Sequence, residues 1–392
     1  MVNPRDLREG MHFVGAVDWK RRLFDELIPI PDGTSYNAYA IRGSSKLALI
    51  DTVDPTMENV LIDSLNQLET KSIDYVVINH AEQDHSGALP RILKTHPEAK
   101  AVATPKCQTM LADLLLIPRE RVITVEDGKT VSLGQRTLQF IHAPWVHWPE
   151  TMLTYLREDK ILFSCDLFGS HLATSDLWVT DEATIYGPAK RYYAEIMMPF
   201  RRMIEKHLER LKEFEIDVIA PSHGPIYDKP ESILGAYRHW VLDPPENLVV
   251  LPYVSMHGST KQMVDHLTEA LVERGVAVKR FDLPHTDIGE LAMALVDAAT
   301  LVLAAPTVLT GAHPAALHAA HLASALNPKV RFIAIIGSYG WGGKTVEQLK
   351  EIISGLKAEL LGTVICKGLP GEEGKRALDS LANAIREKHK EL

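Results

Sequence analysis

Short apolar runs that end in polar turns dominate the first part of the chain. Residues 47–50 and 75–78 contain four consecutive apolar residues each, and a polar residue follows each run at once. This pattern is typical of buried strands, and further extended segments follow between residues 121 and 165. Residues 188–214 have instead the spacing of a helix. The mixture predicts a layered α/β domain.

The pattern of apolar and polar residues changes near residue 246. Residues 242–247 hold two prolines among polar residues, which indicates a break between domains. Beyond it, apolar strands alternate with helical patterns, as in a doubly wound parallel sheet. Five strands are predicted, at residues 247–254, 276–283, 300–306, 331–337 and 360–366. We therefore predict two α/β domains, residues 1–245 and residues 246–392.

The composition fits large folded domains and excludes several classes of protein. Of 392 residues, 46% are apolar and 24% are charged, as in ordinary globular proteins. The net charge of −9 argues against nucleic acid as a partner, because phosphate binding requires a basic surface. The three cysteines form no CxxC pair, and we find neither a signal peptide nor an uninterrupted apolar span of membrane length. We expect a cytoplasmic protein that does not enter a membrane.

Histidines and carboxylates gather behind the predicted strands of the first domain. Four of them fall within six residues directly after the run 75–78, and three more follow later strands. The candidates are His80, Glu82, Asp84, His85, His147, Asp166 and His223. Imidazole nitrogens and carboxylate oxygens without thiolates suit a hard or borderline divalent metal, and a carboxylate can bridge two ions. The simplest interpretation is a dinuclear metal site.

The HxExDH cluster and the later histidines and aspartate resemble the metallo-β-lactamase superfamily over the whole first half, and the flavodiiron branch within it. The resemblance implies a metallo-β-lactamase-like αββα fold for this domain. Hydrolases of the superfamily usually carry HxHxDH, whereas this chain has Glu82 in place of the middle histidine. A carboxylate at that position adds negative charge, which favours iron over zinc and stabilises ferric iron.

The resemblance also implies how two irons would be held, with three donors to one ion, two to the other, and one bridging both. In that order the residues are His80, Glu82 and His147, then Asp84 and His223, then Asp166. His85 is either a further ligand or a hydrogen-bond donor behind the ligands. Trp148 and Tyr193 are expected to line the substrate pocket. Other histidines, among them His171, lack matching partners in the sequence, so we expect structural roles for them.

Three loops of the second domain follow its predicted strands as a nucleotide site requires. The first combines hydroxyl residues and glycine before a helix, whose N-terminus attracts a phosphate. Ligands of doubly wound sheets lie beyond the carboxyl ends of the strands. The candidate contacts are Ser255, Met256, His257, Gly258, Ser259, Thr260, Pro306, Thr307, Val308, Leu309, Ser338, Tyr339, Gly340 and Trp341. The domain resembles flavodoxin and lacks a GxGxxG pattern, so FMN is the expected cofactor.

The two predicted sites together imply an oxidoreductase. From the flavodiiron resemblance, we expect a diiron site that reduces dioxygen to water, nitric oxide to nitrous oxide, or both, with electrons supplied through FMN. The resemblance also implies a head-to-tail homodimer or a dimer of dimers. Because the sequence has no rubredoxin-like CxxC pair, we expect an external electron donor such as rubredoxin or another reductant. Many family members carry a histidine before the segment 36–39, where this chain has Phe24-Asp25-Glu26-Leu27-Ile28, so the sequence does not choose between the gases.

Two other classes of protein compete with this interpretation. One is a binuclear zinc hydrolase with a regulatory flavodoxin-like half, against which Glu82 argues. The other is an electron-transfer flavoprotein with a vestigial metal site, against which the intact ligand set argues. Two irons, two zincs or no metal per chain would distinguish the three.

Overall fold

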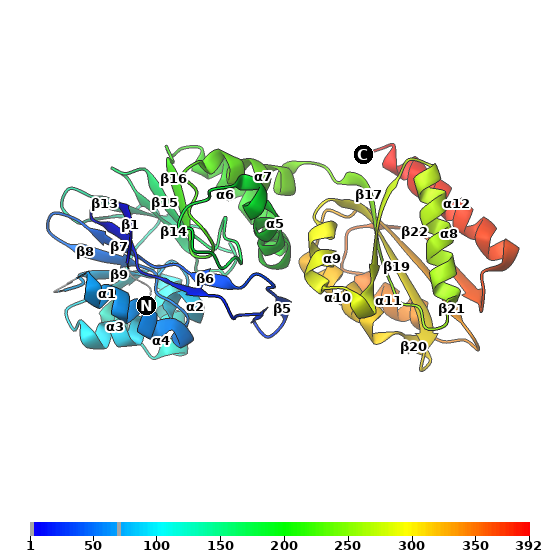
Figure 1. The fold of residues 1–392 in the computed structure, drawn as a ribbon, viewed down its shortest axis with the longest axis horizontal. Helices are drawn as coiled ribbons and strands as arrows, with labels where there is room; N and C mark the ends of the chain where they lie inside the picture. Colours follow the sequence, from blue (N-terminus) through cyan, green and yellow to red (C-terminus); the bar gives the residue numbers. More distant parts are fainter. Residues whose placement is uncertain (1–3, 69–71) are drawn as a thin grey trace. The chain divides into compact units, whose positions relative to one another are not determined.

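The computed structural model of the protein describes residues 4–68 and 72–392, which form two compact units. The first unit extends to Tyr193 and includes Phe200–Val241, and the second comprises Ala194–Pro199 and Leu242–Leu392. In Figure 1 the first is coloured from blue to green, and the second, apart from Ala194–Pro199, from yellow-green to red. The domain boundary between residues 245 and 246 remains our proposal.

A larger and a smaller sheet form the centre of the first unit (Figure 1). The larger has the strand order β1 (Arg5–Arg8), β2 (Met11–Phe13), β7 (Tyr39–Arg42), β8 (Leu47–Ile50), β9 (Tyr75–Val77), β10 (Lys100–Ala103), β11 (Val122–Thr124). The smaller has the order β12 (Thr130–Ser132), β13 (Thr137–His142), β14 (Met152–Leu156), β15 (Ile161–Cys165), β16 (Val218–Pro221). Short antiparallel pairs are formed by β3 (Ala16–Asp18) with β6 (Thr34–Tyr36) and β4 (Leu23–Phe24) with β5 (Ile28–Pro29).

Helices cover the outer faces of these sheets. On the larger sheet lie α1 (Glu58–Gln67), α3 (Leu89–Thr95) and α4 (Pro105–Leu115), and near the smaller sheet lie α5 (Glu182–Tyr192), α6 (Arg201–Leu211) and α7 (Pro230–Leu242). Successive side chains of a strand point to opposite faces, and β8 uses both. Leu47 and Leu49 join the core under the helices, whereas Ala48 and Ile50 join the core between the sheets. The result is an αββα sandwich.

The second unit is built on a parallel sheet. Its order is β18 (Ala277–Asp282), β17 (Glu246–Tyr253), β19 (Ala298–Val308), β21 (Phe332–Tyr339), β22 (Glu359–Lys367), and β20 (Gly311–Ala312) pairs with the end of β19. One face is covered by α8 (Ser259–Glu273) and α12 (Gly371–His389), the other by α9 (Ile288–Leu295), α10 (Pro314–Leu326) and α11 (Thr345–Ile353). The chain changes direction across the sheet between β17 and β19, which makes a topological switch point.

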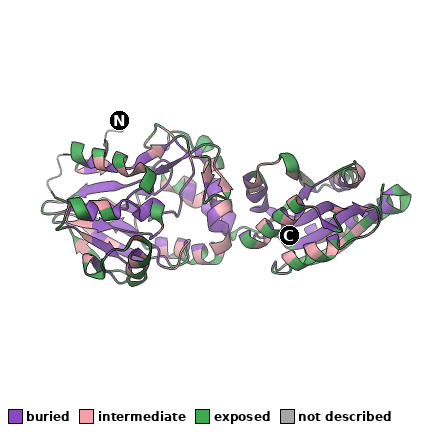
Figure 2. Cartoon of the chain, turned by 90° about the horizontal axis from the view of Figure 1, so that it is seen from below, coloured by how far each residue is buried: buried purple, intermediate pink, exposed green. Residues whose placement is uncertain are grey.

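Burial follows this layering. In Figure 2 the strands are mostly buried, while the helices alternate between buried and exposed residues. Within residues 4–68 and 72–392, no helix has the length and apolar character needed to cross a membrane.

Candidate metal centre and nucleotide loops

The larger sheet of the first unit contributes four of the candidate ligands from one short segment. His80 follows β9 after two residues, and Glu82 directly precedes the one-turn helix α2 (Gln83–Ser86). Asp84 and His85 lie within that helix and are buried. A turn of helix directly behind a buried strand thus holds carboxylates and imidazoles close together.

The smaller sheet contributes the other three. Asp166 follows β15 directly, and His223 lies two residues beyond the end of β16. These two strands are parallel neighbours, so their carboxyl ends meet at one edge of the sheet. His147 lies in the connection between β13 and β14. The structure brings all seven candidates together.

One group of donors consists of His80, Glu82 and His147. Nε2 of His80 lies 3.0 Å, and Nε2 of His147 3.3 Å, from the same oxygen, Oε2 of Glu82. One donor atom from each residue lies within 4.8 Å of the others. This spacing is compatible with shared coordination of one ion.

A second group consists of Asp84, His85 and His223. Nε2 of His85 lies 3.3 Å from Oδ1 of Asp84, and Nε2 of His223 lies 3.2 Å from Oδ2 of the same carboxylate. Among the described residues, neither oxygen of Asp84 nor Nε2 of His223 has a hydrogen-bond partner, although all three atoms are buried. Buried polar atoms without partners are costly unless a ligand satisfies them, so these residues fit a metal ion.

Asp166 lies between the two groups. Its Oδ2 is 3.4 Å from Nε2 of His147 and 3.7 Å from Nε2 of His80. Its Oδ1 is 3.1 Å from Nε2 of His85 and 3.3 Å from Nε2 of His223. Each oxygen therefore faces a different group, which is the arrangement of a bridging carboxylate.

The electrostatics of the cluster are those of a cation site. Burial opposes the charged form of His147, but hydrogen bonds with Asp166 and Glu82 outweigh it and raise the pKa of His147 to about 9. Burial opposes the charged form of His223 as well, but the adjacent carboxylates of Asp166 and Asp84 outweigh it and raise the pKa of His223 to about 10. Burial also opposes the ionised form of Asp166, but the surrounding histidines hold its pKa well below the usual range. Protons and metal ions compete for such nitrogens, so metal binding here would release protons.

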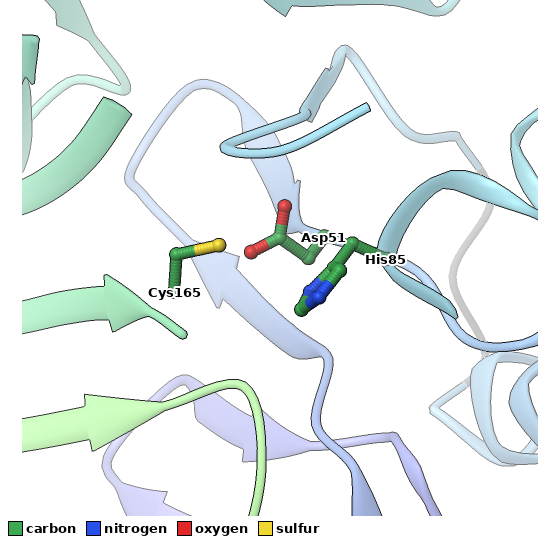
Figure 3. Close-up of side chains that lie close together, drawn as sticks. All are labelled: Asp51, His85 and Cys165. Carbon is green, nitrogen blue, oxygen red and sulfur yellow. The ribbon is translucent and has the colours of Figure 1, made fainter. Parts of the chain in front are cut away.

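Asp51 and Cys165 lie beside His85, as Figure 3 shows, with the thiol directed toward the carboxylate. The oxygens of Asp51 already accept hydrogen bonds from the backbone N–H and the side-chain amide of Asn79, both at 2.8 Å, and from Ser222 Oγ at 3.4 Å. Burial raises the pKa of Asp51 to about 6 and also raises the pKa of the Cys165 thiol. Asp51, His85 and Cys165 therefore pack together where β8 and β15 end, and we do not count them as a separate metal site.

A cavity of about 350 Å³ opens beside the donors. Trp148 lines it, and its ring stands nearly perpendicular to that of His80, with centroids 4.9 Å apart. The early loop reaches the same cavity through Phe24 and Asp25. Burial, followed by the charges of Glu82 and Asp84, raises the pKa of Asp25 to about 6. The early loop thus contributes a carboxyl group to the cavity.

The structure distinguishes two adjacent tyrosines. The hydroxyl of Tyr192 donates a hydrogen bond to Oδ1 of Asp166 at 2.8 Å. Tyr193 is fully buried, its hydroxyl lies 3.4 Å from the carbonyl oxygen of Trp240, and its ring packs on Tyr237 and Trp240. The structure therefore brings Tyr192, and not Tyr193, to the donor cluster.

Sequence reasoning missed three further residues near the donors. Glu150 is buried, and its Oε1 lies 2.7 Å from Nδ1 of His80. His171 is buried with its ring 5.3 Å from that of His223. Tyr192 is the third. Only their proximity in space reveals them, because their partners lie 26 to 70 residues away in the sequence.

The predicted nucleotide loops lie at the carboxyl ends of β17, β19 and β21, which are neighbours in the sheet. Hydroxyl contacts tie them together: Thr260 Oγ1 lies 2.9 Å from Ser338 Oγ, and Thr307 Oγ1 lies 2.8 Å from Thr345 Oγ1.

Gly258 precedes helix α8 with φ +89°, a conformation that favours glycine. A Cβ at Gly258 would meet no atom within 4 Å, so space remains beside the start of the helix. Ser255 Oγ accepts hydrogen bonds from the N–H groups of Gly258 and Lys261. Trp341 is 84% exposed. This arrangement fits a phosphate at the helix N-terminus and a planar ring over exposed loop residues.

Comparisons with known proteins find relatives over nearly the whole chain. The model of the ODP family beta lactamase matches residues 34–224. A nitric oxide reductase of Moorella thermoacetica is 36% identical over 92% of each chain, and a coenzyme F420H2 oxidase of Methanothermobacter marburgensis is 31% identical over 89% of each. The solved rubredoxin oxygen:oxidoreductase of Desulfovibrio gigas is 28% identical over 99% of each chain, with a TM-score of 0.94.

The fold and the donor set define a metallo-β-lactamase-like unit followed by a flavodoxin-like unit, so the predicted fold class is confirmed. The chain belongs to the flavodiiron protein family, whose members include type A flavoproteins.

Proposed function

We propose that this protein reduces dioxygen, nitric oxide or both at a diiron site, with electrons supplied through FMN. The observation that carries the proposal is Asp166, whose two oxygens face two separate groups of metal donors. Relatives named nitric oxide reductase, coenzyme F420H2 oxidase and rubredoxin oxygen:oxidoreductase support both gases as substrates. Reduction of dioxygen to two waters takes four electrons and four protons, whereas joining two nitric oxides into nitrous oxide and water takes two of each.

The two donor groups would each hold one iron, and iron would supply the redox chemistry on the gas. We assign His80, Glu82 and His147 to one ion and Asp84 and His223 to the other, with Asp166 shared. The distances from His85 Nε2 to Asp84 and Asp166, 3.3 Å and 3.1 Å, support His85 as a further ligand of the second ion. Oxygen and nitrogen donors without thiolate suit iron.

The residues around the irons have non-redox tasks. Trp148 and Phe24 contribute apolar surface to the cavity, which limits the access of water to the donors. The Tyr192 hydroxyl orients one oxygen of Asp166. We retain Trp148 as a pocket residue and place Tyr192 closer to the reaction than Tyr193.

FMN would occupy the loops of the second unit. We propose that the start of α8, with residues 255–260, holds the phosphate, and that residues 306–309 and 338–341 hold the ring. The family resemblance further supports an external reductant and a head-to-tail homodimer or dimer of dimers, and the low cysteine content supports a cytoplasmic location. A dimer of this kind would be isologous, with each flavin serving the partner's irons.

The test is to purify the protein anaerobically and to quantify iron, zinc and FMN per chain. The reduced protein is then mixed with dioxygen or nitric oxide separately, and consumption of each gas is followed. Two irons, one FMN and rapid loss of either gas are the expected result. Two zincs without gas consumption would instead favour the hydrolase, and flavin without metal would favour the electron-transfer protein.

A further inference from the structure

Two buried histidines, one in each donor group, are backed by different chemical partners. Nδ1 of His80 lies 2.7 Å from Oε1 of Glu150. Nδ1 of His223 donates instead to the backbone carbonyl oxygen of Ser35, also at 2.7 Å. A metal-binding histidine usually donates its other ring N–H to such a group, and the partner sets the orientation and basicity of the ring. The difference is between an anion and a neutral dipole.

Glu150 is held in place for this contact. Its side chain is fully enclosed, and Oε1 also accepts a hydrogen bond from the backbone N–H of Ala81 at 3.0 Å. The hydroxyl of Thr104 donates to the backbone carbonyl oxygen of Glu150 at 3.0 Å. Within residues 4–68 and 72–392, Oε2 of Glu150 has no hydrogen-bond partner. A buried carboxylate is costly unless a nearby positive charge compensates it, and His80 is its direct partner.

We propose that Glu150 is a positioning residue that fixes the tautomer of His80 and thereby makes the two metal positions chemically unequal. With Nδ1–H held by the carboxylate, the lone pair of Nε2 points to the donor group of Glu82 and Asp166. A carboxylate behind an imidazole makes it a stronger donor.

The two metal positions therefore differ in what lies behind their histidines. The first has Glu82 among its donors and Glu150 behind His80, whereas the second has Asp84 among its donors, a neutral carbonyl behind His223 and the buried carboxylate of Asp51 beside His85. Removing the charge of Glu150 should lower the basicity of His80 and so act on the first position. Because anionic surroundings favour the higher oxidation state of iron, the same change should raise the midpoint potential of the iron at His80. The statement about iron rests on the proposed function, whereas the difference between the two positions does not.

The informative substitutions leave the shape of the site nearly unchanged. Glu150→Gln removes the charge and keeps the volume. Glu150→Asp keeps the charge but shortens the side chain, so the carboxylate lies farther from His80. Thr151→Val is the matched control, because Thr151 is the adjacent residue, is 1% exposed, and its hydroxyl has no partner within the described residues. Thermal unfolding and FMN content of each variant check that the chain folds.

Two measurements test the proposal. Titration of the metal-free protein with cobalt(II) reports the affinity of each position, and Mössbauer spectra of partly oxidised ⁵⁷Fe protein report which iron is ferric. Glu150→Gln should weaken one position by roughly 10- to 100-fold and raise the midpoint potential of that iron only. Glu150→Asp should recover part of both effects, and Thr151→Val should match the unmodified protein.

Equal weakening of both positions, or no change in either, would overturn the proposal. The cobalt titration separates this inference from the proposed function. If the unmodified protein fails to reduce either gas but Glu150→Gln still weakens one cobalt position, the diiron function fails and the role of Glu150 stands. If gas reduction is found but the variant binds cobalt normally at both positions, the diiron function stands and the role of Glu150 fails.

Discussion

The two candidate sites lie at equivalent places in their folds but are built from different chemical groups. Both lie beyond the carboxyl ends of neighbouring parallel strands. In the first unit the site is made of charged side chains that are almost fully buried, with His80 0% and Asp166 1% exposed. In the second unit the candidate site combines glycine, hydroxyl groups and backbone with exposed side chains, among them Leu309 and Trp341, which are 92% and 84% exposed.

This difference follows from what each site would bind. A pair of cations needs anionic donors held close together and away from water. The protein must therefore bury negative charges that repel one another. A phosphate needs oriented N–H groups, and a flat ring needs an accessible face, neither of which requires buried charge. The first site should therefore depend strongly on each charge and on pH, and the second should not.

The largest effect is expected from Asp166→Asn, which removes the charge that both donor groups share. Removing one member of a buried charge network costs about 3–5 kcal/mol, which corresponds to a factor of roughly 100 or more in binding. We expect loss of at least one metal ion per chain and of gas reduction, with FMN content unchanged. Metal analysis and flavin absorbance on one sample check this. Simultaneous loss of flavin would show that the sites are not independent.

Metal removal should separate the two units next. An ion present at about 100 times its dissociation constant stabilises the folded state by about 2.7 kcal/mol, and a chelator removes that contribution. Calorimetry of the full chain with and without chelator should shift only the transition assigned to the first unit. A shift of both transitions would contradict the comparison.

The metal-free first unit should also lose stability as the pH rises. The pKa of His147 is raised from 6.5 to about 9 and that of His223 to about 10, because their carboxylate partners outweigh burial. A raised pKa stabilises the fold fully below the unfolded value of 6.5, and this stability is lost as the pH rises through 9 to 10. Thermal unfolding across that range, in chelator, measures the effect.

The adjacent tyrosines provide a smaller and more local test. Tyr192→Phe removes a hydrogen bond to a charged oxygen of Asp166, an interaction worth about 1.5–3 kcal/mol. We expect metal affinity to fall roughly tenfold or more. Tyr193→Phe is the matched control, because its hydroxyl faces the carbonyl oxygen of Trp240. A larger effect at Tyr193 would restore the sequence-based choice of that residue as the pocket tyrosine.

This pair illustrates where prediction from sequence succeeds and where it stops. Most candidate donors were predictable because they follow apolar strands closely, and the carboxyl ends of parallel strands must meet at one edge. His147 is different, since it lies in the connection between the antiparallel strands β13 and β14. The choice between Tyr192 and Tyr193 was not, because adjacent helical residues point in different directions and a π-helical turn begins at Tyr193. That turn changes the direction of the side chains without any visible signal in the composition.

Glu150 was beyond sequence reasoning for a different reason. It lies 70 residues from His80, and no spacing rule relates a carboxylate in the β13–β14 connection to an imidazole after β9. The α/β class and the five strands of the second unit follow from periodicity, and the αββα fold of the first was implied by the family resemblance, but the partners behind the ligands depend on how two sheets pack. Such partners become visible only when the structure is known.

The smallest effect is expected in the stability of the second unit. Its pH dependence should have the opposite sign to that of the metal-free first unit. His389 is 8% exposed at the end of α12, where Nδ1 meets Oδ1 of Asn247 at 2.8 Å and Nε2 meets Oγ1 of Thr300 at 2.6 Å. Burial lowers the pKa of His389 below 6.5, so the unfolded chain takes up a proton first. The stability is therefore fully present above pH 6.5 and is lost as the pH falls below it.

Hydrogen exchange of the amides in β17 and α12, in the full chain between about pH 8 and pH 5, checks this prediction after correction for the intrinsic rates. Protection should weaken toward acid, and His389→Gln should flatten the dependence because glutamine does not titrate in this range. The amides of the metal-free first unit around the donor cluster should show the reverse trend, since the donor histidines His147 and His223 are stabilised as cations. If protection fell toward acid in both units, the carboxylate partners of His147 and His223 would not explain how these histidines differ from His389.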